Sequence, residues 1–166
     1  DNKASSGVDS DYTTSETLYG DLTQSQFVPE TADVSYRVYN ATAAWDLGFG
    51  DLTSSTSYGS NTQDFRVDFT TLLRNIFGLD IFDSYNQQTT RVKRFTQELR
   101  LASHENEQVD WMVGAYYNDE EGLIDQYVHI VEPGTLTDFE GFPLIGIITL
   151  DSNYKELAAF ANATIK

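Results

Sequence analysis

The sequence predicts an all-β fold: an antiparallel meander of about five long strands that forms part of a transmembrane β-barrel with long extracellular loops. Three observations lead to this prediction. Side chains alternate between apolar and polar over long stretches, the connections between these stretches are short and long in turn, and the composition is rich in Tyr (10) and Phe (10) but poor in Pro (3). Such a composition favours strands over helices.

The alternating stretches have the two-residue period that a strand imposes on its side chains. They cover residues 34–46, 51–67, 91–103, 109–127 and 153–166. The complete stretches are much longer than the five or six residues of an average globular strand. Strands of this length suit a wall between lipid and a wet lumen.

The connections support the same architecture. Residues 47–50 and 104–108 are expected to form short turns, whereas 68–90 and 130–152 are long, the first with a short helix near Leu72–Leu79. In transmembrane barrels the periplasmic turns are short and the extracellular loops are long. We therefore divide the chain into an extracellular loop region at 1–32, which is expected to hold a short strand near Thr17–Leu22, and a partial barrel at 33–166.

A soluble antiparallel sheet with one buried face would alternate in the same way. The apolar face of these strands is thin, however, because alanines such as Ala41, Ala43 and Ala159 occupy many of its positions and Gln97 interrupts it. A soluble core would hold more Ile, Val and Leu at such positions. This difference favours the barrel.

Two sets of site residues follow from the alternation, because a charge that faces lipid costs about 2–4 kcal/mol at the membrane midplane. Polar side chains are expected to face the lumen: Arg94, Glu98, Arg100, Asn40 and Asn162. Apolar and aromatic side chains are expected to face lipid or to form the interfacial girdle: Tyr39, Trp45, Phe95, Leu99, Leu101, Trp111 and Tyr117. For the charged lumenal residues, the alternative is a structural set of ion pairs without ligand contact. We expect ligand selectivity to depend on the long loops.

Composition and motifs restrict the function. The formal charge of −16 repels phosphate backbones, which excludes nucleic acid as a partner, and the absence of cysteine excludes thiolate metal sites. The acidic runs Asp119–Glu121 and Asp9–Asp11 lack the spacing of a calcium loop, and His104 and His129 are isolated in sequence. No nucleophile or nucleotide-binding motif is present. We therefore expect no metal, no cofactor and no enzymatic activity.

Consecutive segments resemble one known family. Arg94–Ser103 (RFTQELRLAS), a polar turn and Val109–Glu120 (VDWMVGAYYNDE) resemble the barrel hairpins of TonB-dependent receptors. Trp45–Tyr58 is similar to the hairpin that precedes this one in the family, and Leu157–Thr164 is similar to the strand that follows it. The similarity covers about residues 36–166 apart from the loops.

This resemblance implies a barrel of about 22 strands with an N-terminal plug. Such a receptor takes up a scarce ligand, of the siderophore–iron, cobalamin or oligosaccharide class, with energy delivered through the TonB complex. The implied partners are outer-membrane lipid, the plug domain, the remaining barrel strands and TonB. Because the sequence has no recognisable plug, TonB-contacting segment or closing strand, we expect an internal barrel fragment in the bacterial outer membrane. The alternatives are a passive porin-type barrel and a soluble carbohydrate-binding β-sandwich.

Overall fold

The protein is all-β with one short helix, and its computed structural model describes residues 2–4, 25–104 and 108–166. In chain order, the elements are β1 (Asn2–Ala4), β2 (Thr31–Asp46), β3 (Gly50–Asp68), α1 (Thr70–Phe77), β4 (Asp83–Ser103), β5 (Val109–Val131) and β6 (Leu144–Ile165). The expected antiparallel meander of five long strands is therefore confirmed.

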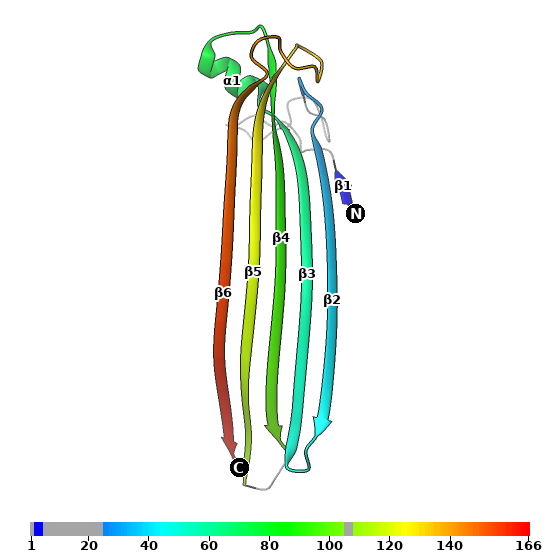
Figure 1. Cartoon of the computed structure of the whole chain (residues 1–166), viewed down its shortest axis with the longest axis vertical. Helices are drawn as coiled ribbons and strands as arrows, with labels where there is room; N and C mark the ends of the chain where they lie inside the picture. Colours follow the sequence, from blue (N-terminus) through cyan, green and yellow to red (C-terminus); the bar gives the residue numbers. More distant parts are fainter. Residues whose placement is uncertain (1, 5–24, 105–107) are drawn as a thin grey trace, which may run out of the picture. The chain divides into compact units, whose positions relative to one another are not determined.

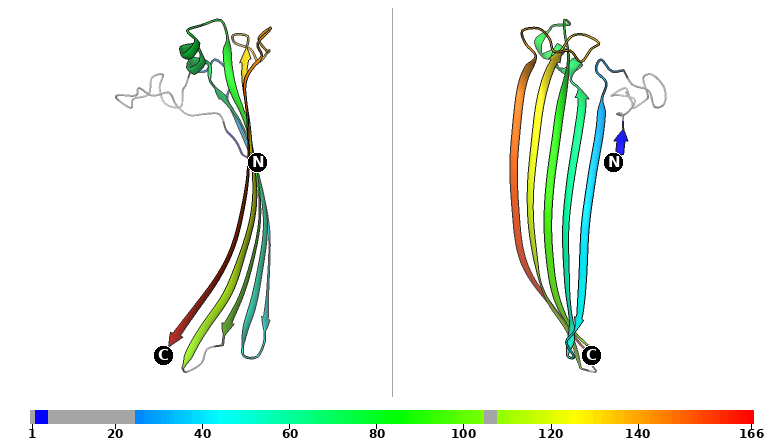
Figure 2. Two further views of the ribbon diagram at one scale, coloured as in Figure 1. Left: turned by 60° about the vertical axis from the view of Figure 1, so that its left-hand side comes forward. Right: turned by 45° about the vertical axis from the view of Figure 1, so that its right-hand side comes forward.

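The strands pair in sequence order, β1-β2-β3-β4-β5-β6, and the sheet does not close on itself within the part of the chain that the structure describes. Both the front view of Figure 1 and the rotated views of Figure 2 show β2 to β6 side by side in this order. β1 adds a short antiparallel pairing at the start of β2, where Asn2 faces Val34 and Ala4 faces Ala32.

The chain divides into two compact units. Unit 1 consists of residues 1–35, 62–90 and 123–150, and unit 2 consists of residues 36–61, 91–122 and 151–166. Each long strand therefore contributes one part to unit 1 and another part to unit 2. α1 and the connection between β5 and β6 belong to unit 1, and the turn between β2 and β3 belongs to unit 2.

Unit 1 has a small hydrophobic core. Leu73 of α1, Phe82 and Ile130 are buried together, and the partly buried Phe69, Val128, Phe139 and Ile145 pack against them. α1 contributes only Leu73 to this core, because its other large apolar side chains, Leu72, Ile76 and Phe77, are exposed. The short helix that was expected near Leu72–Leu79 is thus confirmed, with slightly earlier bounds.

Both long connections are shorter than expected. The first spans only 69–82 because β4 begins at Asp83, and the second spans 132–143 because β5 continues to Val131 and β6 begins at Leu144. The sequence obscured these strand ends because neither segment alternates: residues 83–90 are polar on both faces, and residues 144–150 are almost all apolar. At the N-terminus, β1 and the first residues of β2 lie within the expected loop region 1–32, whereas Thr17–Leu22 and Asp9–Asp11 lie outside the described residues.

The turn between β2 and β3 is tight, as expected for residues 47–50. The Leu47 amide donates to the Gly50 carbonyl oxygen at 2.9 Å, and the Gly48 amide donates to Asp46 Oδ1 at 2.7 Å. Gly50 is required here because a Cβ atom at this position would collide with the Ala102 carbonyl oxygen of β4.

Candidate lipid-facing surface

Contacts between neighbouring strands determine which residues of unit 2 share a face. The Phe95 ring lies 6.4 Å from the Tyr117 ring, the Thr56 hydroxyl bonds to Gln97, and Lys155 Nζ lies 3.2 Å from an Asp119 carboxylate oxygen. Because side chains alternate along a strand, these contacts define one face, here called the apolar face. It holds the odd-numbered positions of β2, β4, β5 and β6 and the even-numbered positions of β3 in unit 2.

The opposite face, here called the polar face, is fixed by a second set of contacts. Arg94 forms an ion pair with Glu120, and Lys166 Nζ lies 2.8 Å from an Asp110 carboxylate oxygen. The structure therefore places Arg94, Glu98 and Arg100 on the face opposite to Phe95, Leu99 and Leu101. These contacts show which residues share a face; that one face meets the lumen and the other meets lipid stays a prediction.

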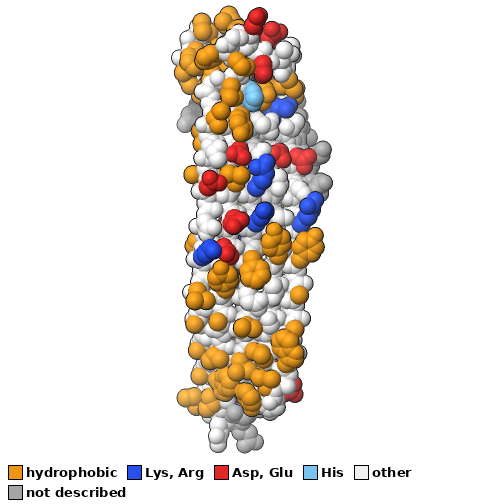
Figure 3. All heavy atoms as spheres, viewed as in Figure 1, with side chains coloured by type: hydrophobic (Ala, Val, Ile, Leu, Met, Phe, Trp, Pro, Cys, Tyr) orange, Lys and Arg blue, Asp and Glu red, His pale blue; other side chains and the backbone are white. Residues whose placement is uncertain are grey.

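Two rows of large side chains cross the apolar face. The first row is aromatic and contains Tyr39, Tyr58, Phe95 and Tyr117; the second contains Trp45, Leu52, Leu101 and Trp111. Val38 and Gly59 are neighbours across β2 and β3, because a Cβ atom at Gly59 would lie 3.9 Å from Val38 Cγ2. In an antiparallel pair the adjacent residues, Tyr39 and Tyr58, therefore lie at the same level. Figure 3 shows hydrophobic side chains gathered on this face, with Lys, Arg, Asp and Glu next to them.

The uncharged part of the apolar face has the height that a bilayer requires. In each strand, a stretch of about nine residues places no charged side chain on this face. Examples are Phe95–Ser103 in β4 and Leu157–Ile165 in β6. At about 3.3 Å per residue this is roughly 30 Å along the strand. A tilt of about 40° reduces it to a height close to the apolar band of about 25 Å in outer-membrane barrels.

The large side chains of this face are open to their surroundings. Tyr39 is 66% exposed, Trp45 is 50% exposed and Leu157 is 80% exposed. Among the described residues, every buried hydrophobic side chain belongs to unit 1: Val28, Leu73, Phe82, Ile130 and Val131. The apolar side chains of unit 2 therefore form an extended exposed surface rather than a core, and such surfaces mark contacts with another molecule or with a membrane.

Gln97 lies in the middle of the apolar face, but its polar groups are satisfied locally. Its amide nitrogen donates to Ser54 Oγ at 3.0 Å and to the Glu98 carbonyl oxygen at 3.1 Å, and its amide oxygen accepts from the Thr56 hydroxyl. A polar side chain is tolerated in an apolar medium when its hydrogen bonds are made internally. The polar groups of Gln97 therefore need no partner outside the sheet.

A belt of charged side chains borders the aromatic row on the same face. It consists of Arg37, Lys93, Asp119, Glu121, Lys155 and Asp151, and is here called the charged belt. Lys155 and Asp119 form an ion pair within it. Along β2, β4 and β5 the order is therefore apolar positions, then an aromatic ring, then a charge, which is the order of environments across a membrane interface.

The polar face of unit 2 carries hydroxyl, amide and charged groups. Asn40 accepts from the Thr42 hydroxyl at 3.4 Å, and Asn162 lies beside Asp110 and Met112 along a shallow hollow. Asn61 and Asn118 also lie here, and the side-chain oxygen of each is buried without a hydrogen-bond partner among the described residues. Such atoms are normally satisfied by water or by a further polar group.

The histidines behave differently from each other. His104 Nε2 lies 3.4 Å from Asp46 Oδ1 and 3.5 Å from Asp51 Oδ1 in unit 2, and all three side chains are exposed. The sequence did not bring this group together because its members lie at the ends of three different strands. In unit 1, His129 stacks on Tyr85 with ring centroids 4.7 Å apart. The guanidinium carbon of Arg66 also lies over the Tyr85 ring, 5.1 Å from its centre. Burial raises the pKa of the Tyr85 hydroxyl.

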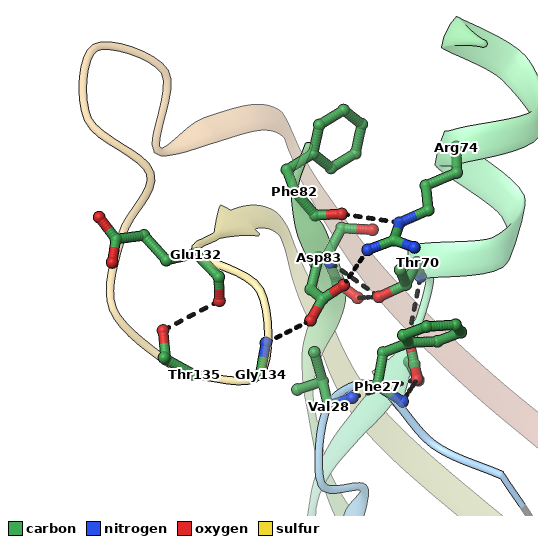
Figure 4. A network of polar contacts seen from close by, with 11 residues as sticks. Phe27, Val28, Thr70, Arg74, Phe82, Asp83, Glu132, Gly134 and Thr135 are labelled. Carbon is green, nitrogen blue, oxygen red and sulfur yellow. Dashed lines mark hydrogen bonds and ion pairs between the residues drawn. The ribbon is translucent and has the colours of Figure 1, made fainter. Parts of the chain in front are cut away.

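A buried carboxylate organises the loops of unit 1 (Figure 4). Asp83 forms an ion pair with Arg74 of α1 at 2.7 Å, and its other oxygen accepts from the Gly134 amide of the 132–143 connection at 2.6 Å. Arg74 also donates to the Phe82 carbonyl oxygen at 2.9 Å and lies 4.7 Å from the centre of the Phe27 ring. Asp83 thus joins the helix to the loop that follows β5.

A second carboxylate, Asp68, holds the segment before β2. It accepts from the amides of Phe27 at 2.6 Å, Val28 at 3.2 Å and Thr70 at 2.8 Å. Thr70 is itself bonded to Ser84 in both directions. Sequence reasoning assigned ligand selectivity to these loops but named neither carboxylate, because their partners lie far away along the chain.

A scan against protein-family models, a search of curated proteins and a search of solved structures each found no match. Among the described residues, no helix combines the length and the apolar character needed to cross a membrane.

Proposed function

We propose that this chain forms part of the barrel wall of an outer-membrane TonB-dependent receptor, which takes up a scarce ligand of the siderophore–iron, cobalamin or oligosaccharide class. The two faces of unit 2 are the observation that carries the proposal. One face is apolar, exposed and bordered by aromatic rings and then by charges; the other is polar. A strand that separates lipid from a water-filled lumen needs this division.

The proposal also accounts for the missing core of unit 2. In water, exposed side chains such as Trp45, Tyr39 and Leu157 would be unfavourable, but acyl chains are a good solvent for them. Ligand specificity is assigned to unit 1, where α1 and the 132–143 connection are joined through Asp83. In this arrangement, Arg94, Glu98 and Arg100 face the lumen and contact water, the plug or neighbouring strands.

Spin labels at single cysteines test the placement of the two faces. Because the sequence contains no cysteine, each introduced one is unique. We choose Leu99→Cys and Leu157→Cys for the apolar face, with Thr96→Cys and Asn162→Cys as matched controls on the polar face. In lipid vesicles, the first pair should collide mainly with oxygen, which concentrates in lipid, and the second pair with a water-soluble nickel chelate. Protection of the first pair from both reagents would indicate a second protein layer, as in a soluble β-sandwich.

The energy source distinguishes a receptor from a passive porin. In the bacterium that carries the protein, accumulation of the ligand should stop when the proton-motive force is dissipated or when TonB is removed. A porin-type barrel would continue to admit its solute down a gradient under both conditions. Uptake that is unchanged by the loss of TonB would therefore contradict the receptor while leaving the barrel intact.

A further inference from the structure

The polar face of unit 2 contains a hollow that crosses four neighbouring strands. Its lining includes Tyr36 of β2, Gly59 and Asn61 of β3, Arg94 of β4 and Glu120 of β5, all of which belong to unit 2. The volume of the hollow is about 330 Å³, within the range of roughly 300–1,000 Å³ that is usual for small-molecule sites. On the proposed function, this hollow opens toward the lumen.

Gly59 lines the hollow, although neither its backbone nor its packing requires a glycine. Its φ is not positive, and a Cβ atom at this position would meet no atom closer than the Arg37 carbonyl oxygen at 3.8 Å. A glycine inside a strand weakens the strand, and it often marks a place where a ligand approaches the backbone closely. The absent side chain of Gly59 leaves the space above β3 open to such a ligand.

Asn61 supplies an unsatisfied acceptor beside an exposed ring. Its Oδ1 atom is buried and has no hydrogen-bond partner among the described residues, and an oxygen in this state normally binds water or a further polar group. Tyr36 is the cross-strand neighbour of Asn61, in the register that pairs Val38 with Gly59, and it is 69% exposed. The two residues together suit a ligand that has both an apolar patch and hydrogen-bond donors.

The charges of the hollow cancel each other. Arg94 directs Nε and Nη2 to the same carboxylate oxygen of Glu120, Oε2. Arg94 Nη1 can therefore donate to a further partner, and Glu120 Oε1 can accept from one. Because the pair is neutral as a whole it does not favour a charged ligand, and the formal charge of −16 repels an anionic one. Hydroxyl groups, which both donate and accept, match these groups.

We propose that this hollow binds one sugar residue of a neutral oligosaccharide. The C–H groups on one side of the sugar ring pack on Tyr36. Its hydroxyl groups donate to Asn61 Oδ1 and Glu120 Oε1 and accept from Arg94 Nη1. The inference rests on the proposed function, of which it selects one ligand class, because a hollow on the polar face meets the lumen only in a barrel wall.

Binding of soluble probes to the full chain in lipid vesicles tests the ligand class. The neutral probes are maltotriose, cellotriose, xylotriose and mannotriose; the others are trigalacturonate, which is anionic, a ferric trihydroxamate and cyanocobalamin. Isothermal titration calorimetry should detect binding of at least one neutral sugar and of none of the other three probes. Absence of binding by all four neutral sugars, or equally tight binding of trigalacturonate, would overturn the assignment.

Three substitutions then locate the site of the sugar that binds. Asn61→Ala removes the unsatisfied acceptor and should weaken binding about tenfold, the effect of one lost hydrogen bond. Tyr36→Ala removes the ring and should weaken binding by a similar factor, about tenfold. Gly59→Val fills the hollow and should abolish binding, while urea titration shows a stability that is unchanged or higher.

Asn40→Ala is the matched control, because it removes an exposed amide of the polar face outside the lining of the hollow. It should leave the affinity for the sugar unchanged. Equal losses of affinity in Asn40→Ala and Asn61→Ala, or full affinity in Gly59→Val, would place the sugar elsewhere and overturn the proposal.

The spin label at Leu99 distinguishes failure of this inference from failure of the proposed function. A label that lies in lipid, together with no sugar binding, would refute the sugar site and leave the barrel wall standing. A label that never contacts lipid, together with sugar binding that Gly59→Val abolishes, would refute the barrel wall and support the sugar site alone.

Discussion

Unit 1 and unit 2 use the same five strands in different ways. Unit 1 contains every buried hydrophobic side chain of the described residues, together with a helix and a buried ion pair. Unit 2 contains none of those buried hydrophobic side chains; it exposes more large apolar side chains on the apolar face than on the polar face, where Val38 and Phe160 are also exposed. Unit 1 is therefore organised by internal contacts, whereas unit 2 presents an exposed apolar surface of the kind that contacts another molecule or a membrane.

The charges of the two units follow the same division. Among the described residues, acidic side chains outnumber basic ones by about three to one in unit 1, whereas the two kinds are nearly balanced in unit 2. Charges of unit 2 are paired across strands, as in Arg94–Glu120 and Lys155–Asp119. Among the described residues, the excess negative charge thus lies mainly in unit 1.

The largest expected effect tests the internal organisation of unit 1. Asp83→Ala leaves Arg74 without its carboxylate and the Gly134 amide without its acceptor. Because the carboxylate is almost fully buried, we expect a loss of about 3–5 kcal/mol in the local stability of α1 and the 132–143 connection. Amide hydrogen exchange of these two segments measures the loss.

Asp80→Ala is the matched control, because this carboxylate is exposed and lies only three residues away. It should change hydrogen exchange little. Comparable effects of the two substitutions would show that Asp83 does not join the helix to the loop. In both variants the spin label at Leu99 should report the same surroundings as before, since unit 2 does not depend on this contact.

The next effect tests the external partner of unit 2. Leu99→Arg places a charge on the apolar face. We expect it to lower the free energy of unfolding from lipid vesicles, and hence the stability, by about 2–4 kcal/mol. Thr96→Arg lies on the polar face of the same strand and should have a much smaller effect. Urea titration of the vesicle-bound protein measures both. Equal losses would mean that the two faces do not meet different solvents.

The two units also differ in how far their structures follow from the sequence. In unit 2, the apolar side chains around Phe95, Leu99 and Trp111 alternate with polar ones, so strand, face and short turn were all predictable. In unit 1, residues 83–90 are polar on both faces and residues 144–150 are almost all apolar, so the first parts of β4 and β6 were placed within long connections. A periodic pattern reveals a strand only where its two sides meet different environments.

The residues that hold unit 1 together were not predictable for a different reason. Asp83 and Gly134 are separated along the chain by β4 and β5, and Asp68 bonds to Phe27 across β2 and β3. Contacts of this kind depend on the register of the sheet, which the sequence does not state. The same reason explains why His104, Asp46 and Asp51 were not recognised as neighbours.

A smaller effect tests the close packing of β4, β5 and β6 in unit 2. A Cβ atom at Gly114 would collide with the Phe160 ring and lie 2.9 Å from the Leu99 carbonyl oxygen. Gly114→Ala should therefore destabilise unit 2 by about 1–3 kcal/mol in urea titrations from vesicles. Gly59→Ala is the control, since its Cβ would meet no atom closer than 3.8 Å. Phe160→Leu, combined with Gly114→Ala, should recover part of the lost stability. If it does not, the collision with the Phe160 ring is not the cause of the loss.

The smallest effect concerns the polar trio within the apolar face. Gln97→Ala removes the partner of Ser54 and Thr56 and leaves two hydroxyl groups facing an apolar medium. We expect a loss of about 1 kcal/mol, the usual size of a side-chain hydrogen bond within a membrane. The triple variant Ser54→Ala, Thr56→Val, Gln97→Leu removes all three polar groups together and should recover the stability of the original chain in vesicles. In a soluble sheet, with this face open to water, Gln97→Ala would be nearly neutral and the triple variant would promote aggregation. The sign of the difference in stability between the two variants therefore identifies the solvent of the apolar face.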